Sequence, residues 1–314
     1  MRYLWLPLLG AVALVGCAQT TLTESGNLAK AGQTAAAQMH AAATLSADQT
    51  AALKMATAFH RGFMAAGAPT ATQQSIDANI TAIETELESR AQFLDSLGNA
   101  YAGLGALSSY GGVSAFDAAY ASLMTDSNAL LKTLKAHPLP AVVPADVETM
   151  SAVFVGLVQK KQIMAASKAM RSPLNAVIAA LSDNEAAFTG LSDICVRQTR
   201  DAAIDLYASH MLSVTPVLDQ LAAPLSLKSA ANADQLAASN PRVMSGLAAV
   251  VAQQADHQDQ LVVATYDKSL AALKALLPLH DALEKGGAVD LTTISAVTAE
   301  IQTLATQLKS AKGH

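Results

Sequence analysis

The sequence predicts an all-α fold, an elongated antiparallel bundle of several helices. Of its 314 residues, 52% are hydrophobic but only 4% are aromatic. Alanine and leucine carry most of this apolar content, and both favour helices over strands. Apolar residues recur at steps of three and four along most of the chain, which is the period of a helix. No stretch shows sustained alternation or an Asn-Gly hairpin turn, so we expect essentially no sheet.

Helix boundaries follow from capping residues, prolines and glycines. Ser46 and Gln49 have the spacing of a capping box, and the prolines at 69, 173, 216 and 241 suit a first helical turn. Gly111-Gly112, the Pro-rich joint at 137–144 and Gly286-Gly287 indicate breaks. The expected helices cover residues 22–44, 46–66, 69–107, 114–136, 145–171, 173–212, 215–238, 241–277 and 290–311.

The helix expected at 69–107 has the clearest pattern. Its opposite face is polar, with Glu84, Glu86, Glu88 and Arg90, and we expect that face to lie in solvent. A helix of this length would run about 58 Å at 1.5 Å per residue, hence the prediction of an elongated fold. Its apolar stripe comprises Ile76, Ile80, Ile83, Leu87, Ala91, Leu94, Leu97, Tyr101 and Leu104.

Ten leucines and valines between residues 218 and 277 repeat the apolar theme, so we expect them in the core too. They are Leu218, Leu221, Leu225, Leu247, Val250, Val251, Leu261, Leu270, Leu273 and Leu277.

The joint at 137–144 is either a linker between two bundles or a long crossover within one. Neither composition nor charge changes across it. We favour one bundle, because the helices before the joint are few for an independent core.

The first twenty residues have the organisation of an export signal. Arg2 supplies a positive start, residues 4–15 are mostly apolar, and small residues precede Cys17. The apolar run is too short for a bilayer-spanning helix of about 20 residues. Leu14-Val15-Gly16-Cys17 resembles the lipobox of bacterial lipoproteins. The alternative is an ordinary secretory signal, in which Cys17 is incidental.

This resemblance implies that Cys17 carries a diacylglyceryl thioether, that residues 1–16 are removed as a signal peptide, and that the new amino group is acylated. Residues 17–314 would then be a bundle domain attached to the membrane through its lipid anchor. Ala18 and Gln19 follow in place of the aspartate that favours inner-membrane retention, so we expect the outer membrane, with the domain facing the periplasm or the cell surface.

Lipidation would leave Cys195 alone, so no intrachain disulfide is expected. Cys195 lies on an apolar helical stripe, and Asp193, Arg197, Asp201 and Asp205 lie on the other side. A buried thiol is therefore favoured over a reactive one. The stripe comprises Leu174, Val177, Leu181, Phe188, Leu191, Cys195, Ala202 and Leu206.

Two clusters contain residue types that bind metals. His280 and Glu284 are four residues apart on one helical face, and Asp256, His257 and Asp259 lie close together in sequence. A bundle metal site of the di-iron type needs Glu-x-x-His on two helices, and that pattern is missing here. We therefore interpret both clusters as solvated polar faces and expect no metal and no cofactor.

The remaining patterns favour contact over catalysis. The sequence has no nucleophile elbow and no phosphate-binding glycine loop, and its scattered Lys and Arg residues argue against nucleic acid. We expect a non-catalytic adaptor, scaffold or binding subunit with an unidentified envelope protein as its partner. The alternative is a membrane-perturbing protein that inserts the apolar segment 150–158, MSAVFVGLV, although a buried segment explains that run more simply.

Overall fold

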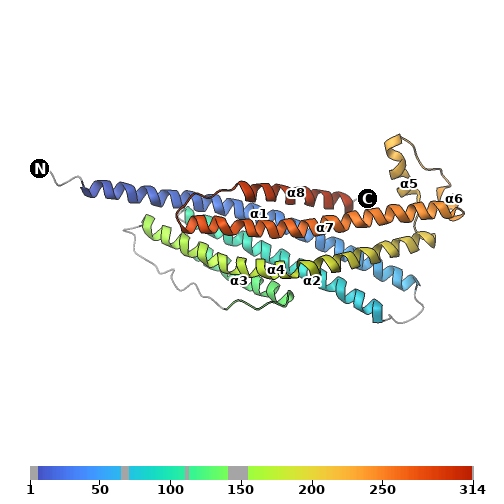
Figure 1. Ribbon diagram of the computed structural model, residues 1–314, viewed down its shortest axis with the longest axis horizontal. Helices are drawn as coiled ribbons and strands as arrows, with labels where there is room; N and C mark the ends of the chain where they lie inside the picture. Colours follow the sequence, from blue (N-terminus) through green and yellow to red (C-terminus); the bar gives the residue numbers. More distant parts are fainter. Residues whose placement is uncertain (1–5, 65–70, 110–112, 141–154, 313–314) are drawn as a thin grey trace. The chain divides into compact units, whose positions relative to one another are not determined.

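A computed structural model describes residues 6–64, 71–109, 113–140 and 155–312, with the side chains of residues 6–19 outside the description (Figure 1). The described residues form eight α-helices and the short 3₁₀ helix η2, with no β-strand among them, so the predicted all-α bundle is confirmed. The elements are α1 (Leu6–Met64), α2 (Ala71–Ser108), α3 (Val113–Thr133), α4 (Val155–Ala208), α5 (Thr215–Ala222), η2 (Ala223–Leu225), α6 (Ala233–Ala238), α7 (Pro241–Glu284) and α8 (Thr292–Lys312).

The chain divides into two compact units. Unit 1 comprises Met1–Leu45, Thr85–Glu185 and Thr265–Lys309, and unit 2 comprises Ser46–Glu84, Ala186–Ala264 and Ser310–His314. The chain passes from one unit to the other within α1, α2, α4, α7 and α8.

In unit 1, α1 and α2 run antiparallel. A β-carbon added to Gly105 would lie 3.2 Å from Ala29, and one added to Gly98 would lie 3.5 Å from Ala36. Residue numbers therefore rise along one helix as they fall along the other. Glycine and alanine at these positions let the two backbones approach closely.

The pairing of α4 with α7 in unit 1 is also antiparallel. The Ser167 hydroxyl forms a hydrogen bond with His280, and further along α4 the carbonyl of Leu181 accepts a hydrogen bond from the Tyr266 hydroxyl at 2.5 Å. Residue numbers rise along α4 as those of its partners on α7 fall. Helix α7 ends with Gly286 at φ +71°, and the Gly287 N–H donates to the carbonyl of Ala282 at 2.8 Å. This is the left-handed glycine cap expected at a helix end, and it confirms the break predicted at Gly286-Gly287.

The apolar stripe of α2 is confirmed as a core face. Its residues from Ile80 to Leu104 are all buried, and Ile76 is half-buried. The stripe around Cys195 is confirmed in part. Leu174, Val177, Leu181, Phe188, Ala202 and Leu206 are buried and Leu191 is half-buried, while the side chain of Cys195 lies outside the description.

Helix α1 is continuous where the sequence predicts two helices. The helix start predicted from the capping box at Ser46 is therefore wrong. Ser46 is buried inside the helix, and its carbonyl accepts a hydrogen bond from the Thr50 hydroxyl at 3.0 Å. No glycine or proline interrupts the chain between residues 33 and 61, so nothing local ends the helix.

The helix break predicted before Pro173 is also wrong, because α4 runs through that residue. A proline inside a helix removes one backbone hydrogen bond, at a cost of about 3 kcal/mol. Met170 and Leu174 on either side are fully or almost fully buried. Their packing offsets the lost hydrogen bond. The start of α5 near Pro216 and the start of α7 at Pro241 agree with the prediction.

The single helix predicted at 215–238 is replaced by α5, η2 and α6. Pro224 lacks an N–H and stops α5, and Ser226 then takes a left-handed conformation at φ 56°. This change moves Leu221 and Leu225 out of the core stripe expected for them. The rest of that prediction is confirmed, because Leu247, Val251, Leu261, Leu270 and Leu273 are buried and Leu218, Val250 and Leu277 are half-buried.

Candidate functional site

A buried polar cluster in unit 1 joins α2, α4 and α7. The Tyr101 hydroxyl lies 2.8 Å from Nε2 of His280, and the Ser167 hydroxyl lies 2.8 Å from Nδ1 of the same ring. All three residues are fully buried. Burial lowers the pKa of His280 to about 3, so the ring is neutral at ordinary pH.

The edge of this cluster carries charge. Arg171 pairs with Asp281 at 2.6 Å and with Glu284 at 3.1 Å. The sequence predicted that His280 and Glu284 share a solvated face. This prediction is wrong for His280, which is a core residue. Glu284 forms an ion pair with Arg171.

A hydroxyl held by an imidazole is the arrangement that activates a nucleophile. Here Ser167 and His280 both have 0% exposed surface. A substrate must come within hydrogen-bond reach of the reacting groups, and this position offers no surface for it. We therefore interpret the cluster as a satisfied polar layer that fixes the register of three helices.

A second buried polar layer of unit 1 contains the charged pair that the sequence placed in solvent. Glu86 and Arg90 form the expected i,i+4 pair at 2.5 Å, but the residues are only 6% and 4% exposed. Asn184 donates to the other Glu86 oxygen at 2.9 Å, and the Arg90 guanidinium lies 4.0 Å from the centre of the Tyr266 ring. Burial raises the pKa of Tyr266 to about 12. The predicted polar face of α2 is thus partly core.

The second candidate metal cluster lies on α7 in unit 2. Asp256 and His257 are exposed, whereas Asp259 is half-buried and accepts a hydrogen bond from Ser192 at 2.5 Å. Burial raises the pKa of Asp259. Within the described part of the chain, no group of three His, Cys, Asp or Glu residues could hold a metal ion.

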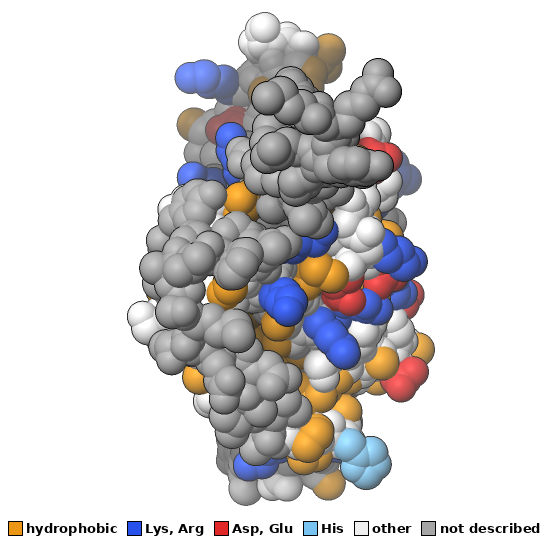
Figure 2. Space-filling view, turned by 90° about the vertical axis from the view of Figure 1, so that its left-hand side faces the viewer, with side chains coloured by type: hydrophobic (Ala, Val, Ile, Leu, Met, Phe, Trp, Pro, Cys, Tyr) orange, Lys and Arg blue, Asp and Glu red, His pale blue; other side chains and the backbone are white. Residues whose placement is uncertain are grey.

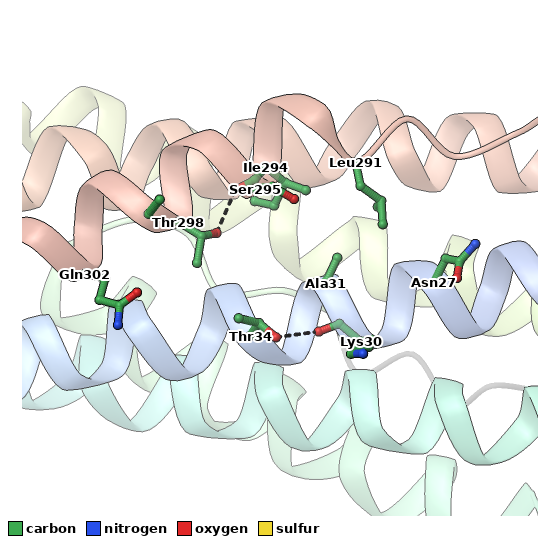
Figure 3. Close-up of a pocket in the computed structure, with 10 residues that line it drawn as sticks. Asn27, Lys30, Ala31, Thr34, Leu291, Ile294, Ser295, Thr298 and Gln302 are labelled. Atoms are coloured by element: carbon green, nitrogen blue, oxygen red, sulfur yellow. Dashed lines mark hydrogen bonds between the residues drawn. The ribbon is translucent and has the colours of Figure 1, made fainter.

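An open groove of about 490 Å³ runs between α1 and α8 of unit 1 (Figure 3). The hydroxyls of Thr34 and Thr298 donate to carbonyls of their own helices, at 2.9 and 2.7 Å. Polar groups that remain along the groove include the Lys30 ammonium and the amides of Asn27 and Gln302. They are spread along the groove and do not converge on one point.

In unit 2, the stretch of sequence that joins α4 to α7 carries an exposed apolar surface. Large hydrophobic side chains are exposed there, and the most exposed is Leu225 at 71%. We call residues 211–236 the exposed leucine segment. Outside it, the described residues include one other exposed large hydrophobic side chain, Met55. The exposed members of the segment are Met211, Leu212, Leu221, Leu225, Leu227 and Leu236.

Beneath these side chains the segment has a small core of its own. Val214 and Val217 of the segment pack with Leu247 and Val251 of α7, together with Ala233 and Ala237. Two carboxylates fix the loops: Asp219 accepts hydrogen bonds from the backbone and hydroxyl of Ser229, both at 2.7 Å, and Asp234 accepts one from the Val214 N–H at 2.7 Å. The bonds from Ser229 lower the pKa of Asp219.

Several sequence predictions fall outside the description. The side chain of Cys17 lies outside it, as do residues 141–154, which include part of the joint at 137–144 and most of the segment 150–158. From Val155 onward that segment belongs to α4. No helix in the described ranges is both long enough and apolar enough to span a bilayer.

Comparison of the chain with protein-family models, curated proteins and solved structures finds no match.

Proposed function

We propose that the chain is a lipid-anchored cell-envelope protein, attached through Cys17, that acts as a non-catalytic adaptor or binding subunit. The observation that carries the proposal of contact is the exposed leucine segment. The lipobox-like residues 14–17 support the anchor, with the outer membrane as its place.

An exposed cluster of large apolar side chains usually indicates a contact surface. Burying one leucine side chain stabilises a complex by about 1.5–3 kcal/mol before the costs of association. Because Val214 and Val217 hold the segment on α7, little ordering of the backbone is needed when a partner binds.

A protein partner fits the charges of this segment better than a bilayer does. Residues 211–236 contain two carboxylates, Asp219 and Asp234, and one ammonium group, that of Lys228. An anionic lipid surface would repel this excess of negative charge, whereas a protein can offer donors to the carboxylates while covering the leucines.

The test has two steps. Photo-crosslinking from position 225 in detergent-solubilised membranes first identifies the contacting protein, and stoichiometric capture of that protein is then measured without a crosslinker. The double variant Leu225→Ser/Leu227→Ser should reduce this capture at least tenfold. Met55→Ser is the matched control, because Met55 is 68% exposed and lies outside the segment. Equal capture by both variants, or crosslinks to lipid alone, would overturn the adaptor proposal.

The anchor has its own test, which is mass spectrometry of the mature N-terminus. We expect acyl chains on the residue at position 17 and no residues from 1–16. An unmodified Cys17 thiol would contradict the anchor. Dye leakage from liposomes that depends on residues 150–158 would instead support the membrane-perturbing alternative.

A further inference from the structure

One end of unit 1 brings together α1, α4 and the loop that follows α7 (Figure 1). The Val289 N–H in the loop donates to Glu24 of α1 at 2.9 Å. The Lys160 ammonium of α4 lies 3.9 Å from the position of a β-carbon added to Gly286. These contacts place the loop beside α1 and the first turns of α4 beside the loop.

Three lysines lie at this end: Lys160, Lys161 and Lys285. Lys161 and Lys285 are exposed and Lys160 is half-buried. In the part of the chain that the structure describes, none of the three forms an ion pair with a carboxylate. Figure 2 faces this end and shows several Lys and Arg side chains near the middle of the face, with acidic and hydrophobic side chains among them.

The nearby carboxylates are already engaged. Glu24 accepts the Val289 N–H, and Asp281 and Glu284 pair with Arg171. Asp290 accepts a hydrogen bond from the Thr292 N–H at 2.9 Å at the start of α8. Among the described side chains, the three lysines are therefore cations of this end that no carboxylate pairs and that an external anion can approach.

Cys17 precedes Glu24 by seven residues in α1, which is about 10 Å of helix. Acyl chains on Cys17 would bring this end of unit 1 to the bilayer surface. A lysine near an anionic lipid surface contributes about 1 kcal/mol of attraction.

We propose that Lys160, Lys161 and Lys285 form a docking surface for the anionic phospholipid headgroups of the bilayer that holds the lipid anchor, and so orient unit 1 on that membrane. This inference depends on the proposed acylation of Cys17. It assigns to the lysines a contact with anionic lipid headgroups, separate from the protein contact assigned to the exposed leucine segment.

The test is amine labelling of the acylated full chain, read for each lysine by mass spectrometry. The protein is placed in detergent, in phosphatidylcholine vesicles, and in phosphatidylcholine vesicles that contain phosphatidylglycerol. In the anionic vesicles alone, labelling of the three lysines should fall about fivefold, the factor that corresponds to 1 kcal/mol for each lysine. High salt should restore it.

Lys309 is the internal control. It is exposed, belongs to unit 1, and lies seventeen residues after Thr292, about 26 Å further along α8. Its labelling should not change among the three conditions. Equal labelling of the three lysines in all conditions, or equal protection in both kinds of vesicle, would overturn the proposal.

A charge-reversal variant uses the same measurement. Lys161→Glu/Lys285→Glu should restore the labelling of Lys160 in the anionic vesicles, whereas Lys309→Glu should leave Lys160 protected. Continued protection of Lys160 in the double variant would overturn the proposal. Acylation is measured separately at Cys17, so an acylated protein without protected lysines refutes this inference alone.

Discussion

Two ion pairs of the same kind show how the two units differ. Glu86 and Arg90 in unit 1 and Asp193 and Arg197 in unit 2 are both i,i+4 pairs with the acid first, and both have N–O distances of 2.5 Å. The side chains of the first pair are 8% and 5% exposed, and those of the second are 52% and 53% exposed. The same local pattern therefore yields a core layer in one unit and a surface pair in the other.

The difference lies in what covers each pair. Asn184 of α4 donates a hydrogen bond to Glu86, and the Tyr266 ring of α7 packs against the Arg90 guanidinium. A buried charge is costly when a partner is missing, whereas water replaces the partner of an exposed one. Unit 1 thus has polar layers that fix its register, whereas unit 2 carries an exposed apolar surface.

The largest expected effect comes from removing one partner of the buried pair. Arg90→Ala should lower the free energy of unfolding by about 3–5 kcal/mol, because Glu86 is left buried without its cation. The matched variant Arg197→Ala should change it by less than about 0.5 kcal/mol. Denaturant unfolding followed by circular dichroism measures both, and similar values for the two variants would break the comparison.

Glycine substitutions give the next contrast. A β-carbon at Gly32 in unit 1 would come 2.4 Å from the Tyr101 ring, whereas one at Gly190 in unit 2 meets nothing within 4 Å. Gly32→Ala should destabilise the protein by about 2–3 kcal/mol by overpacking. Gly190→Ala should stabilise α4 by about 0.5–1 kcal/mol. Thermal unfolding tests both, and a tolerated Gly32→Ala would mean that the packing described around Tyr101 is wrong.

Acid should weaken unit 1 through His280. Its pKa of about 3 lies below the value of 6.5 for an exposed histidine, so between these values the unfolded state binds more protons. Stability should therefore fall as pH decreases through this window, by up to about 1.4 kcal/mol per pH unit from this residue.

Unfolding measured between pH 7 and pH 4 in a His280→Gln variant tests this slope. In this variant the free energy of unfolding should fall less steeply as the pH decreases, because His280 no longer contributes to the slope. The variant His257→Gln, at an exposed position in unit 2, should keep the full slope. An unchanged slope in His280→Gln would show that the ring is accessible to protons in the folded protein.

The smallest effect on stability is expected in the exposed leucine segment. Leu225→Ser should change the free energy of unfolding by less than about 0.5 kcal/mol, because the side chain is already in water. Leu104→Ala, at a fully buried position in unit 1, should cost about 2–5 kcal/mol. A large loss in Leu225→Ser would mean that the segment is covered by the protein itself.

Local sequence signals predicted the helical stretches well but not where all of them end. The period of apolar residues in α2 and the glycine pair after α7 are short-range signals, and both predictions were confirmed. The boundary predicted at Pro173 was wrong because burial of Met170 and Leu174 outweighs the local preference. The boundary predicted at Ser46 was wrong because no glycine or proline near it ends the helix. The opposite error occurred at Pro224, whose lost N–H ends α5 where the leucine spacing suggested continuation.

The candidate sites were harder to predict, because burial depends on residues distant in sequence. His280 meets Tyr101 and Ser167, which precede it by 179 and 113 positions. The exposed leucine segment had one usable signal, the proline at 224, which separates Leu221 from the leucines that follow.

The sequence by itself determined that this protein is helical, since alanine, leucine and their spacing act within a few turns of the chain. Residues 1–17 also resemble an export signal that ends in a lipobox, and from this resemblance we predict membrane attachment. Only the tertiary structure decided that Glu86, Arg90 and His280 are core residues and that Leu225 and Leu227 face solvent. The physical reason is that the period of a helix specifies which side chains share a face, while the neighbouring helices decide whether water reaches that face.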